Sequence, residues 1–225
     1  MSDSDGKMVQ LTASDGFKLD AFEVAASGER RGGIVILQEI FGVTDQLKGV
    51  ARSYAKHGYD TIVPALFDRK GPQTVIPFSE PDRGRETMNS LDKGLTLLDI
   101  AAAVAHLNRG KGVSLIGFCW GGGVAVRCGS ELSLRGAVAF YGTALAANLA
   151  KTPTCPMLFH FGDTDPNSPP DVIEMVKTKL PSAETHIYHA PHGFANEARP
   201  TVYVKEAAET AHQRTLAFLN KLHTK

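Results

Sequence analysis

VSLIGFCWGGGVAV, residues 113–126, is the stretch that decides the fold of this chain. It opens with a largely apolar run typical of a buried strand and closes with an apolar run typical of a packed helix. Between them, Gly117 and Gly121 flank Cys119, at positions where a tight strand-to-helix turn admits only small residues. We therefore expect Cys119 at a strand end with a helix N-terminus behind it, where the helix dipole favours a thiolate and a developing oxyanion.

The pattern Gly-x-Cys-x-Gly matches the nucleophile elbow of α/β-hydrolases, with a thiol where serine is commoner. The pentapeptide alone is equally compatible with a buried structural cysteine in a glycine-rich turn. A dinucleotide-binding fingerprint fails because Cys119 stands where its second glycine would be, and a Walker phosphate loop fails because no Lys-Ser/Thr pair follows the glycines. The interpretation as an elbow therefore depends on an acid and a base later in the chain.

Composition excludes several classes of partner. The 225 residues are 43% hydrophobic and 21% charged, as in an ordinary soluble protein with a substantial core. Lys plus Arg and Asp plus Glu both number 24, and this balance argues against nucleic acid or an anionic membrane as a partner. No run approaches the length of a membrane span, and the polar start Met1–Lys7 lacks the apolar core of a signal peptide. Three cysteines do not make a disulfide framework, so we expect a cytoplasmic protein in which Cys119 is a free thiol.

Strand and helix patterns alternate along the chain. An Asp-Gly turn at 15–16 joins two alternating segments, which predicts an N-terminal antiparallel hairpin. The Pro- and Gly-rich segment 65–81 is predicted to be a long loop. Further strands are predicted at 33–37, 59–63, 113–117, 136–140, 157–161 and 184–188, and helices at 47–57, 83–107, 124–128, 171–180 and 204–223.

This alternation predicts one α/β domain over residues 1–225, with the α/β-hydrolase fold. We expect a mostly parallel central sheet with helices on both faces, preceded by the antiparallel hairpin. Sites in such sheets form at the carboxyl ends of the strands.

An acid and a histidine follow the cysteine in the chain order of α/β-hydrolases. Strand 157–161 is followed by Gly-Asp-Thr-Asp, so Asp163 and Asp165 are both candidates, and His192 lies on a loop after the next strand. A thiol with a pKa of about 8.5 is mostly protonated at neutral pH, so it needs a base, and a buried carboxylate fixes the tautomer of an imidazole base. The simpler alternatives are a surface histidine and two turn-forming aspartates.

The histidines His186, His189 and His192 recur every three residues and invite a zinc interpretation. Successive residues of a strand point to opposite faces, so His186 and His189 are expected to point apart. We therefore predict no metal and no cofactor.

Glu39 follows a buried apolar strand and precedes Ile40-Phe41-Gly42. A carboxylate in such a place is unusual unless it is paired. This favours a role in the site over that of a solvated loop residue.

Four blocks of the chain together resemble the dienelactone hydrolase (carboxymethylenebutenolidase) family. They are Gln-Glu-Ile-Phe-Gly-Val at 38–43, Gly-Phe-Cys-Trp-Gly-Gly at 117–122, Gly-Asp-Thr-Asp at 162–165 and His-Gly at 192–193. The resemblance runs over most of the chain, from Gly33 to Leu222. It implies an α/β-hydrolase fold and a triad of Cys119 as the nucleophile, His192 as the base and Asp165, rather than Asp163, as the acid.

The resemblance also implies two supporting features. Glu39 would hold the resting thiol and assist its activation. The backbone N–H groups of Ile40 and Trp120 would donate to the oxyanion, in agreement with the general rule that the residue after the nucleophile is a donor.

The substrate-binding residues of the family are matched only in part. The resemblance implies two arginines that hold a substrate carboxylate; one position is Asn196 here, and Arg83 or Arg85 could serve as the other. Loss of one arginine predicts weaker binding of a free carboxylate. The aromatic residues Phe41, Tyr141 and Phe194 are further candidates for the substrate pocket.

The sequence thus predicts a hydrolase that opens a small lactone or carboxylic ester through a cysteinyl acyl-enzyme, as a monomer or weak homo-oligomer. The alternative is a non-catalytic or thiol-sensing binding protein on the same fold. The complete Cys-Asp-His order and the lack of a nearby resolving cysteine argue against it. A serine-type esterase is disfavoured because Gly-x-Ser-x-Gly does not occur in the sequence.

Overall fold

The computed structural model describes residues 5–224 of the chain, so the polar start Met1–Ser4 lies outside the described residues. The described chain divides into two compact units, with the boundary between Val113 and Ser114. Within residues 5–224, no helix is both long enough and apolar enough to cross a bilayer. The interpretation of the whole chain as one domain stays a prediction.

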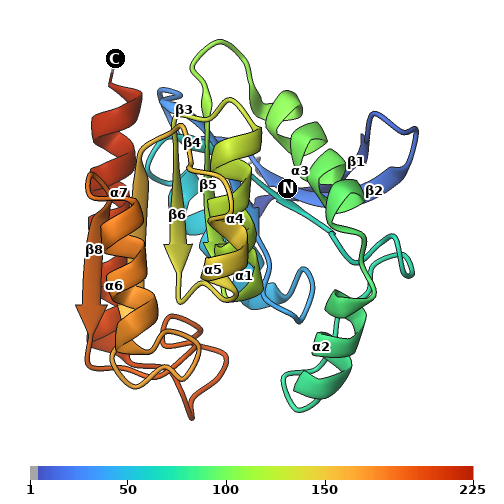
Figure 1. Ribbon diagram of the computed structural model, residues 1–225. Helices are drawn as coiled ribbons and strands as arrows, with labels where there is room; N and C mark the ends of the chain where they lie inside the picture. The colour runs from blue at the N-terminus through green and yellow to red at the C-terminus, as the bar shows by residue number, and fades with distance from the viewer. Residues whose placement is uncertain (1–4, 225) are drawn as a thin grey trace. The chain divides into compact units, whose positions relative to one another are not determined.

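The first unit contains the N-terminal hairpin (Figure 1). Its elements are β1 (Lys7–Thr12), β2 (Lys18–Val24), β3 (Gly32–Leu37), α1 (Asp45–Ala55), β4 (Tyr59–Pro64), α2 (Pro81–Asn89) and α3 (Lys93–Leu107). β1 pairs antiparallel with β2, β2 pairs antiparallel with β4, and β4 pairs parallel with β3. The predicted hairpin is therefore confirmed, and parallel pairing begins at β3.

Burial explains why these segments form strands and helices. Every residue of β3 and β4 is buried, as expected for strands that are covered on both faces. In α1 the buried positions Leu47, Val50, Ala51 and Tyr54 recur at helical spacing. Thr44 caps this helix, because its side chain accepts a hydrogen bond from the N–H of Leu47.

The prediction of one helix at 83–107 is wrong. Two helices, α2 and α3, are separated by a short break at residues 90–92 (Figure 1). Asp92 begins the second helix, because its Oδ1 accepts from the N–H groups of Gly94 at 2.7 Å and Leu95 at 2.9 Å. The helical periodicity of the sequence continues through residues 90–92, so only the capping residue Asp92 indicates that a second helix begins there.

The second unit carries parallel strands. Its elements are β5 (Val113–Phe118), α4 (Trp120–Glu131), β6 (Gly136–Phe140), α5 (Leu145–Asn148), β7 (Met157–Gly162), α6 (Pro170–Lys179), β8 (Glu184–Tyr188) and α7 (Lys205–His223). The pairs β5–β6, β6–β7 and β7–β8 are all parallel. The carboxyl ends of these four strands therefore lie along one edge. The short helix α5 was not predicted, whereas α4 begins at Trp120, directly behind Cys119, and contains the predicted helical segment 124–128.

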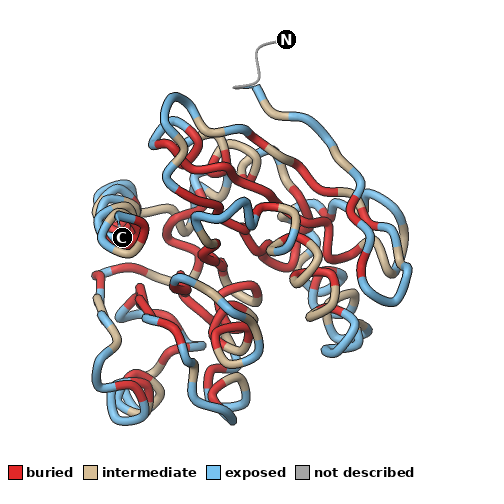
Figure 2. The backbone as a smooth tube through the Cα atoms, turned by 90° about the horizontal axis from the view of Figure 1, so that it is seen from above, coloured by how far each residue is buried: buried red, intermediate tan, exposed pale blue. Residues whose placement is uncertain are grey.

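The strands β5, β6 and β7 are buried along their whole length. The helix α7 buries Ala208, Ala211, Thr215 and Phe218 at helical spacing. In Figure 2 this helix, which ends at the C label, shows buried and exposed stretches alternating around its turns. The parallel strands thus form the apolar layer from which the loops of the candidate site emerge.

Candidate active site

Cys119 alone makes the turn between β5 and α4, since the strand ends at Phe118 and the helix begins at Trp120. Its backbone has φ 55° and ψ −117°, a conformation that non-glycine residues rarely adopt. The backbone around it is held firmly: its N–H donates to the carbonyl of Phe140 at 3.0 Å, and its carbonyl accepts from the N–H of Thr143 at 3.1 Å. The half-buried thiol is thus fixed in a strained turn, as at functional sites generally.

The glycines around Cys119 are required by close approach of the backbone. A Cβ atom at Gly117 would lie 2.0 Å from the carbonyl oxygen of Gly121. At Gly123 it would lie 2.1 Å from the carbonyl oxygen of Thr143. These contacts are far inside van der Waals distance, so the small residues expected from the sequence pattern are needed for the turn itself.

Asp165 and His192 are brought together by parallel strands. Asp165 follows β7 and His192 follows β8, so both lie beyond the carboxyl ends of neighbouring strands. His192 Nδ1 is 2.7 Å from Asp165 Oδ2, where the carboxylate is completely buried and the imidazole is 20% exposed. This is the geometry in which a carboxylate fixes the orientation and tautomer of an imidazole.

His192 also makes a side-chain hydrogen bond with Cys119. Burial by itself lowers the pKa of His192, but the hydrogen bonds with Asp165 and Cys119, and the Coulomb interactions with both, raise it to about 10. The three side chains predicted as a triad are therefore in one chain of contacts within the second unit. Such an imidazole holds a proton strongly beside the thiol.

Asp163, the alternative acid, belongs to a different pair. Its Oδ2 is 2.8 Å from Nδ1 of His189, and its Oδ1 accepts from the N–H of Ala190 at 3.1 Å. The hydrogen bond to His189 lowers the pKa of Asp163 and raises that of His189, and the His189 side chain is 93% exposed. The structure therefore separates the two aspartates that the sequence left open.

The three evenly spaced histidines lie in three environments. His186 stacks on the buried His160 with ring centroids 5.8 Å apart, His189 is exposed beside Asp163, and His192 contacts Asp165. Among residues 5–224, no group of three His, Cys, Asp or Glu side chains is arranged to hold a metal ion.

Aromatic residues support the His192 loop. Tyr141 follows β6 with φ 37°, and its ring lies 5.2 Å from the His192 ring in an edge-to-face arrangement. On its other side, Tyr141 contacts Phe194 at 5.3 Å, and Phe194 contacts Tyr188 at 5.2 Å. Phe194 is completely buried, so the structure gives it a packing contact, and its role in substrate binding stays a prediction.

Asn196 is also almost completely buried. Its Oδ1 accepts from the N–H of Ala198 at 3.2 Å, and its carbonyl accepts from the N–H of Arg199 at 3.0 Å. These bonds shape the segment after His192. A contact between Asn196 and substrate stays a prediction.

The first unit holds the segment Gln38–Gly42. Gln38 anchors it, because its Oε1 accepts from the N–H of Leu66 at 3.1 Å. Glu39 and Ile40 are both buried, at 6% and 8% exposure. A pocket in this unit is lined by Glu39, Phe41, Gly42, Thr44, Gln46, Leu47 and Phe78, with the Phe41 and Phe78 rings 4.8 Å apart in an edge-to-face pair.

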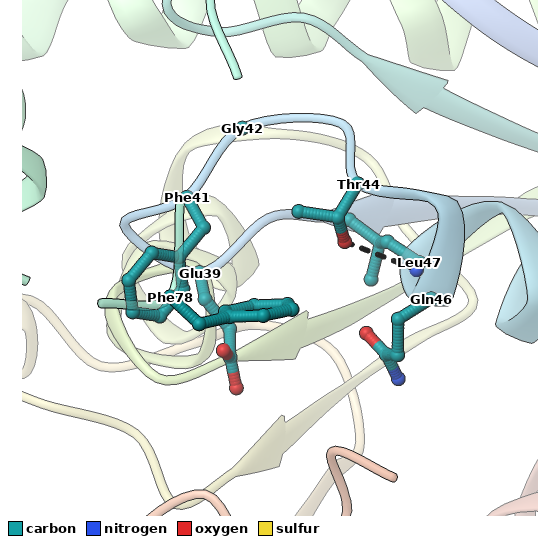
Figure 3. Close-up of a pocket in the computed structure, with 7 residues that line it drawn as sticks. All are labelled: Glu39, Phe41, Gly42, Thr44, Gln46, Leu47 and Phe78. Carbon is teal, nitrogen blue, oxygen red and sulfur yellow. Dashed lines mark hydrogen bonds between the residues drawn. The ribbon is translucent and has the colours of Figure 1, made fainter. Parts of the chain in front are cut away.

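Figure 3 shows the Glu39 carboxylate reaching into this pocket past the Phe78 ring, with Gln46 on the same side. The unusual carboxylate noted in the sequence is therefore buried against aromatic rings. Phe78 comes from the predicted long loop.

Arg83 and Arg85 both lie on α2 and are exposed. Arg83 pairs with Glu80 at 2.9 Å, and Arg85 pairs with Asp82 at 2.5 Å. Each guanidinium thus already faces a carboxylate one turn earlier in the chain. Their expected role in holding a substrate carboxylate stays a prediction.

Sequence reasoning missed Asn167. Its backbone N–H and its Nδ2 both donate to Oδ1 of Asp165, at 2.8 Å and 3.1 Å. The signal for this contact was the spacing Asp-x-Asn, which is typical of a turn in which an aspartate accepts from the backbone two residues on.

Comparison with known proteins gives one family. The sequence model of the Dienelactone hydrolase family matches residues 19–223. A carboxymethylenebutenolidase of Pseudomonas putida is 32% identical over 207 residues, which are 85% of this chain and 86% of that protein. A carboxymethylenebutenolidase of Pseudomonas sp. strain P51 is 30% identical over 204 residues, 84% of each chain.

Solved structures show the same fold. A dienelactone hydrolase-like promiscuous phosphotriesterase from metagenomic libraries superposes with a TM-score of 0.76 at 20% identity, covering 97% of this chain and 99% of that one. The esterase Pf2001 of Pyrococcus furiosus superposes with a TM-score of 0.67 at 16% identity, covering 92% and 90%. The predicted α/β-hydrolase fold is confirmed.

Proposed function

Because this chain belongs to the dienelactone hydrolase family and is a carboxylic ester hydrolase, we propose that it opens a small lactone or ester through Cys119. His192 serves as the base and Asp165 as the residue that orients it. The substrate is a small molecule, as the names of the Pseudomonas relatives indicate.

The contacts that link Cys119, His192 and Asp165 in the second unit support this proposal most strongly. Cys119 stands at positive φ between β5 and α4, His192 makes a hydrogen bond with it, and Asp165 lies 2.7 Å from the far nitrogen of the ring. A buried structural cysteine needs neither a strained turn nor an imidazole partner. Nucleophilic catalysis needs both, because the thiol must be exposed to substrate and must lose its proton.

In the reactive state the proton of the Cys119 thiol resides on Nε2 of His192, whose raised pKa favours the imidazolium beside the thiolate. The thiolate attacks the carbonyl carbon, and the oxyanion forms near the N-terminus of α4. The backbone N–H groups of Trp120 and Ile40 are the two proposed donors to this oxyanion. The C–O bond of the ester then breaks, and the leaving oxygen takes the proton from the imidazolium. In a lactone this oxygen stays attached to the acyl chain.

Hydrolysis of the thioester completes the cycle. Neutral His192 accepts a proton from water, whose oxygen attacks the thioester carbonyl and releases the thiolate of Cys119. The product is a carboxylic acid, which also carries the released hydroxyl group when the substrate is a lactone, and the thiolate–imidazolium pair of Cys119 and His192 is restored. Asp165 stabilises the imidazolium at both steps.

We propose that Glu39 assists activation of the thiol, since it is a buried carboxylate directly after β3, in the position that the family resemblance gives to this role. Asn196 is neutral, and Arg83 and Arg85 are each paired with an acid. We therefore expect esters and lactones without a free carboxylate to be accepted. The proposed cytoplasmic location and the monomeric or weakly oligomeric state rest on the sequence alone.

The proposal is tested by hydrolysis of aryl esters and lactones with the variants Cys119→Ala and His192→Ala. Both are expected to lose essentially all activity, because each removes a group that takes part in bond formation. His189→Ala is the matched control, since His189 is an exposed histidine in the same segment with its own aspartate, and it is expected to keep full activity. Retained activity in purified, folded Cys119→Ala would overturn the proposal.

A further inference from the structure

The two oxygens of the Asp165 carboxylate have separate partners. Oδ2 lies 2.7 Å from Nδ1 of His192. Oδ1 accepts two hydrogen bonds from one residue, from the backbone N–H of Asn167 at 2.8 Å and from its Nδ2 at 3.1 Å. The carboxylate plane is therefore fixed from both sides.

We propose that Asn167 is a positioning residue of the catalytic site, whose side-chain amide holds the Asp165 carboxylate in the plane that orients His192. This inference rests on the proposed function of the triad. It adds a residue that the triad itself does not include.

The Asp165 carboxylate needs the hydrogen bonds from Asn167 because it is buried. The side chain of Asp165 is completely buried, whereas Asn167 is exposed. Asn167 thus lies between Oδ1 and the solvent, and it supplies donors that water would otherwise have to provide. A buried carboxylate is costly unless its oxygens accept hydrogen bonds, so these two donors stabilise the ionised form that His192 requires.

The loop around Asp165 is otherwise tightly built. The N–H of Asp165 donates to the carbonyl of Gly162 at 3.3 Å, and the N–H of Ser168 donates to the carbonyl of Asp165 at 3.0 Å. Pro166 and Pro169 restrict the backbone further. With the backbone held in this way, the remaining freedom of Asp165 is rotation of its carboxylate, and the Asn167 amide acts on that rotation.

The chemistry of the amide explains why asparagine suits this position. It presents a donor to Oδ1 and carries no charge. An aspartate of the same shape would place a second carboxylate against Oδ1 and remove the donor. An alanine would keep only the backbone N–H.

The test compares Asn167→Ala and Asn167→Asp with the wild type, with Asn89→Ala as the control at an exposed asparagine in the first unit. The hydrogen bond is partly exposed, so we expect kcat to fall about threefold to tenfold in Asn167→Ala with KM unchanged. The isosteric Asn167→Asp is expected to lose at least as much. Circular dichroism and thermal unfolding check that each variant is folded.

A purely structural role would not alter the titration of His192. We expect the alkaline limb of kcat/KM and the ¹⁵N titration of His192 to move to lower pH in Asn167→Ala, because a loosened carboxylate stabilises the imidazolium less. Wild-type kcat in folded Asn167→Asp, or an unchanged His192 titration in Asn167→Ala, would overturn the inference. If Cys119→Ala is inactive while Asn167→Asp is fully active, this inference fails and the proposed triad stands; an active Cys119→Ala instead refutes the triad.

Discussion

Replacing Asp165 by asparagine gives a sharply defined prediction. Asparagine keeps the shape of the side chain, but it must present its carbonyl oxygen to the two Asn167 donors that now bind Oδ1. Its NH₂ group then faces Nδ1 of His192, where Oδ2 now lies at 2.7 Å. An NH₂ group can only donate there, so the imidazole is forced to carry its proton on Nε2 and can no longer accept one from Cys119.

The expected loss is large. In a triad, an imidazole held in the wrong tautomer reduces catalysis by about 10³-fold to 10⁴-fold, which is about 4 to 5 kcal/mol of transition-state stabilisation. The pKa of His192 should also fall, because one of the two groups that raise it to about 10 is lost. The wild-type protein gains stability from this raised pKa below pH 6.5 and loses it as the pH rises through about 10. The stability difference between wild type and variant should therefore be larger at pH 6 than above pH 10.

Steady-state hydrolysis of an aryl ester measures the loss, and urea unfolding at several pH values measures the stability difference. Asp163→Asn is the matched control, because Asp163 contacts the exposed His189 instead of His192. It should keep kcat/KM within about threefold of the wild type, since exposed ion pairs contribute little. Near-wild-type activity in folded Asp165→Asn, or an equal loss in Asp163→Asn, would refute the reasoning.

Two further predictions concern stability. His160 is completely buried, and burial holds its pKa well below the usual range, so the unfolded chain binds a proton that the folded protein does not. Acidification below about pH 6.5 should therefore lower the free energy of unfolding, with a contribution from His160 of up to about 1.4 kcal/mol per pH unit. In urea titrations, the free energy of unfolding of a folded His160→Gln variant should depend less steeply on pH than that of the wild type. An equally steep pH dependence in the variant would contradict this prediction. Gly117→Ala should lower the melting temperature and the activity together, because its Cβ would lie 2.0 Å from the carbonyl oxygen of Gly121. Gly49→Ala is the control, because a Cβ atom at this position in α1 would meet open space, and it should leave stability unchanged or raise it by up to about 1 kcal/mol. Equal melting temperatures for Gly117→Ala and Gly49→Ala would count against the tight turn at Gly117.

The parts of the fold that could be predicted are those in which local pattern and tertiary burial agree. The strands β3, β5, β6 and β7 are continuous apolar runs because both of their faces are covered, and such runs are visible in the sequence. Gly117, Gly122 and Gly123 leave no room for a Cβ atom, so the spacing of the glycines around Cys119 was informative. The N-terminal hairpin was marked by its Asp-Gly turn.

The errors arose where two signals compete. Helical periodicity continues from α2 into α3, and only the capping bonds of Asp92 separate the helices. The first turn of α4 is Trp-Gly-Gly-Gly, whose glycines disfavour a helix by intrinsic propensity, so a helical pattern is visible in the sequence only from Val124. Packing overrides that propensity: a Cβ at Gly122 would lie 2.9 Å from the carbonyl oxygen of Phe140.

The candidate site was predictable in its types of residue but less so in its contacts. Chain order pointed to Cys119, an aspartate and His192, while the choice between Asp163 and Asp165 rested on resemblance until the structure placed each beside a different histidine. Asn167 was overlooked because the Asp-x-Asn spacing usually marks only a turn. Its two bonds to Oδ1 depend on the exact path of the loop.

The most direct measurement is the identification of the acylated residue. The enzyme is mixed with a slowly deacylating aryl ester, quenched in acid within milliseconds and digested with trypsin, which releases residues 112–127 as one peptide with Cys119 as its sole cysteine. The account predicts a thioester on Cys119 in an amount matching the burst of released phenol, and no such adduct in Cys119→Ala. A matching burst with the acyl group on any other residue, or hydrolysis that continues undiminished in Cys119→Ala, would contradict it.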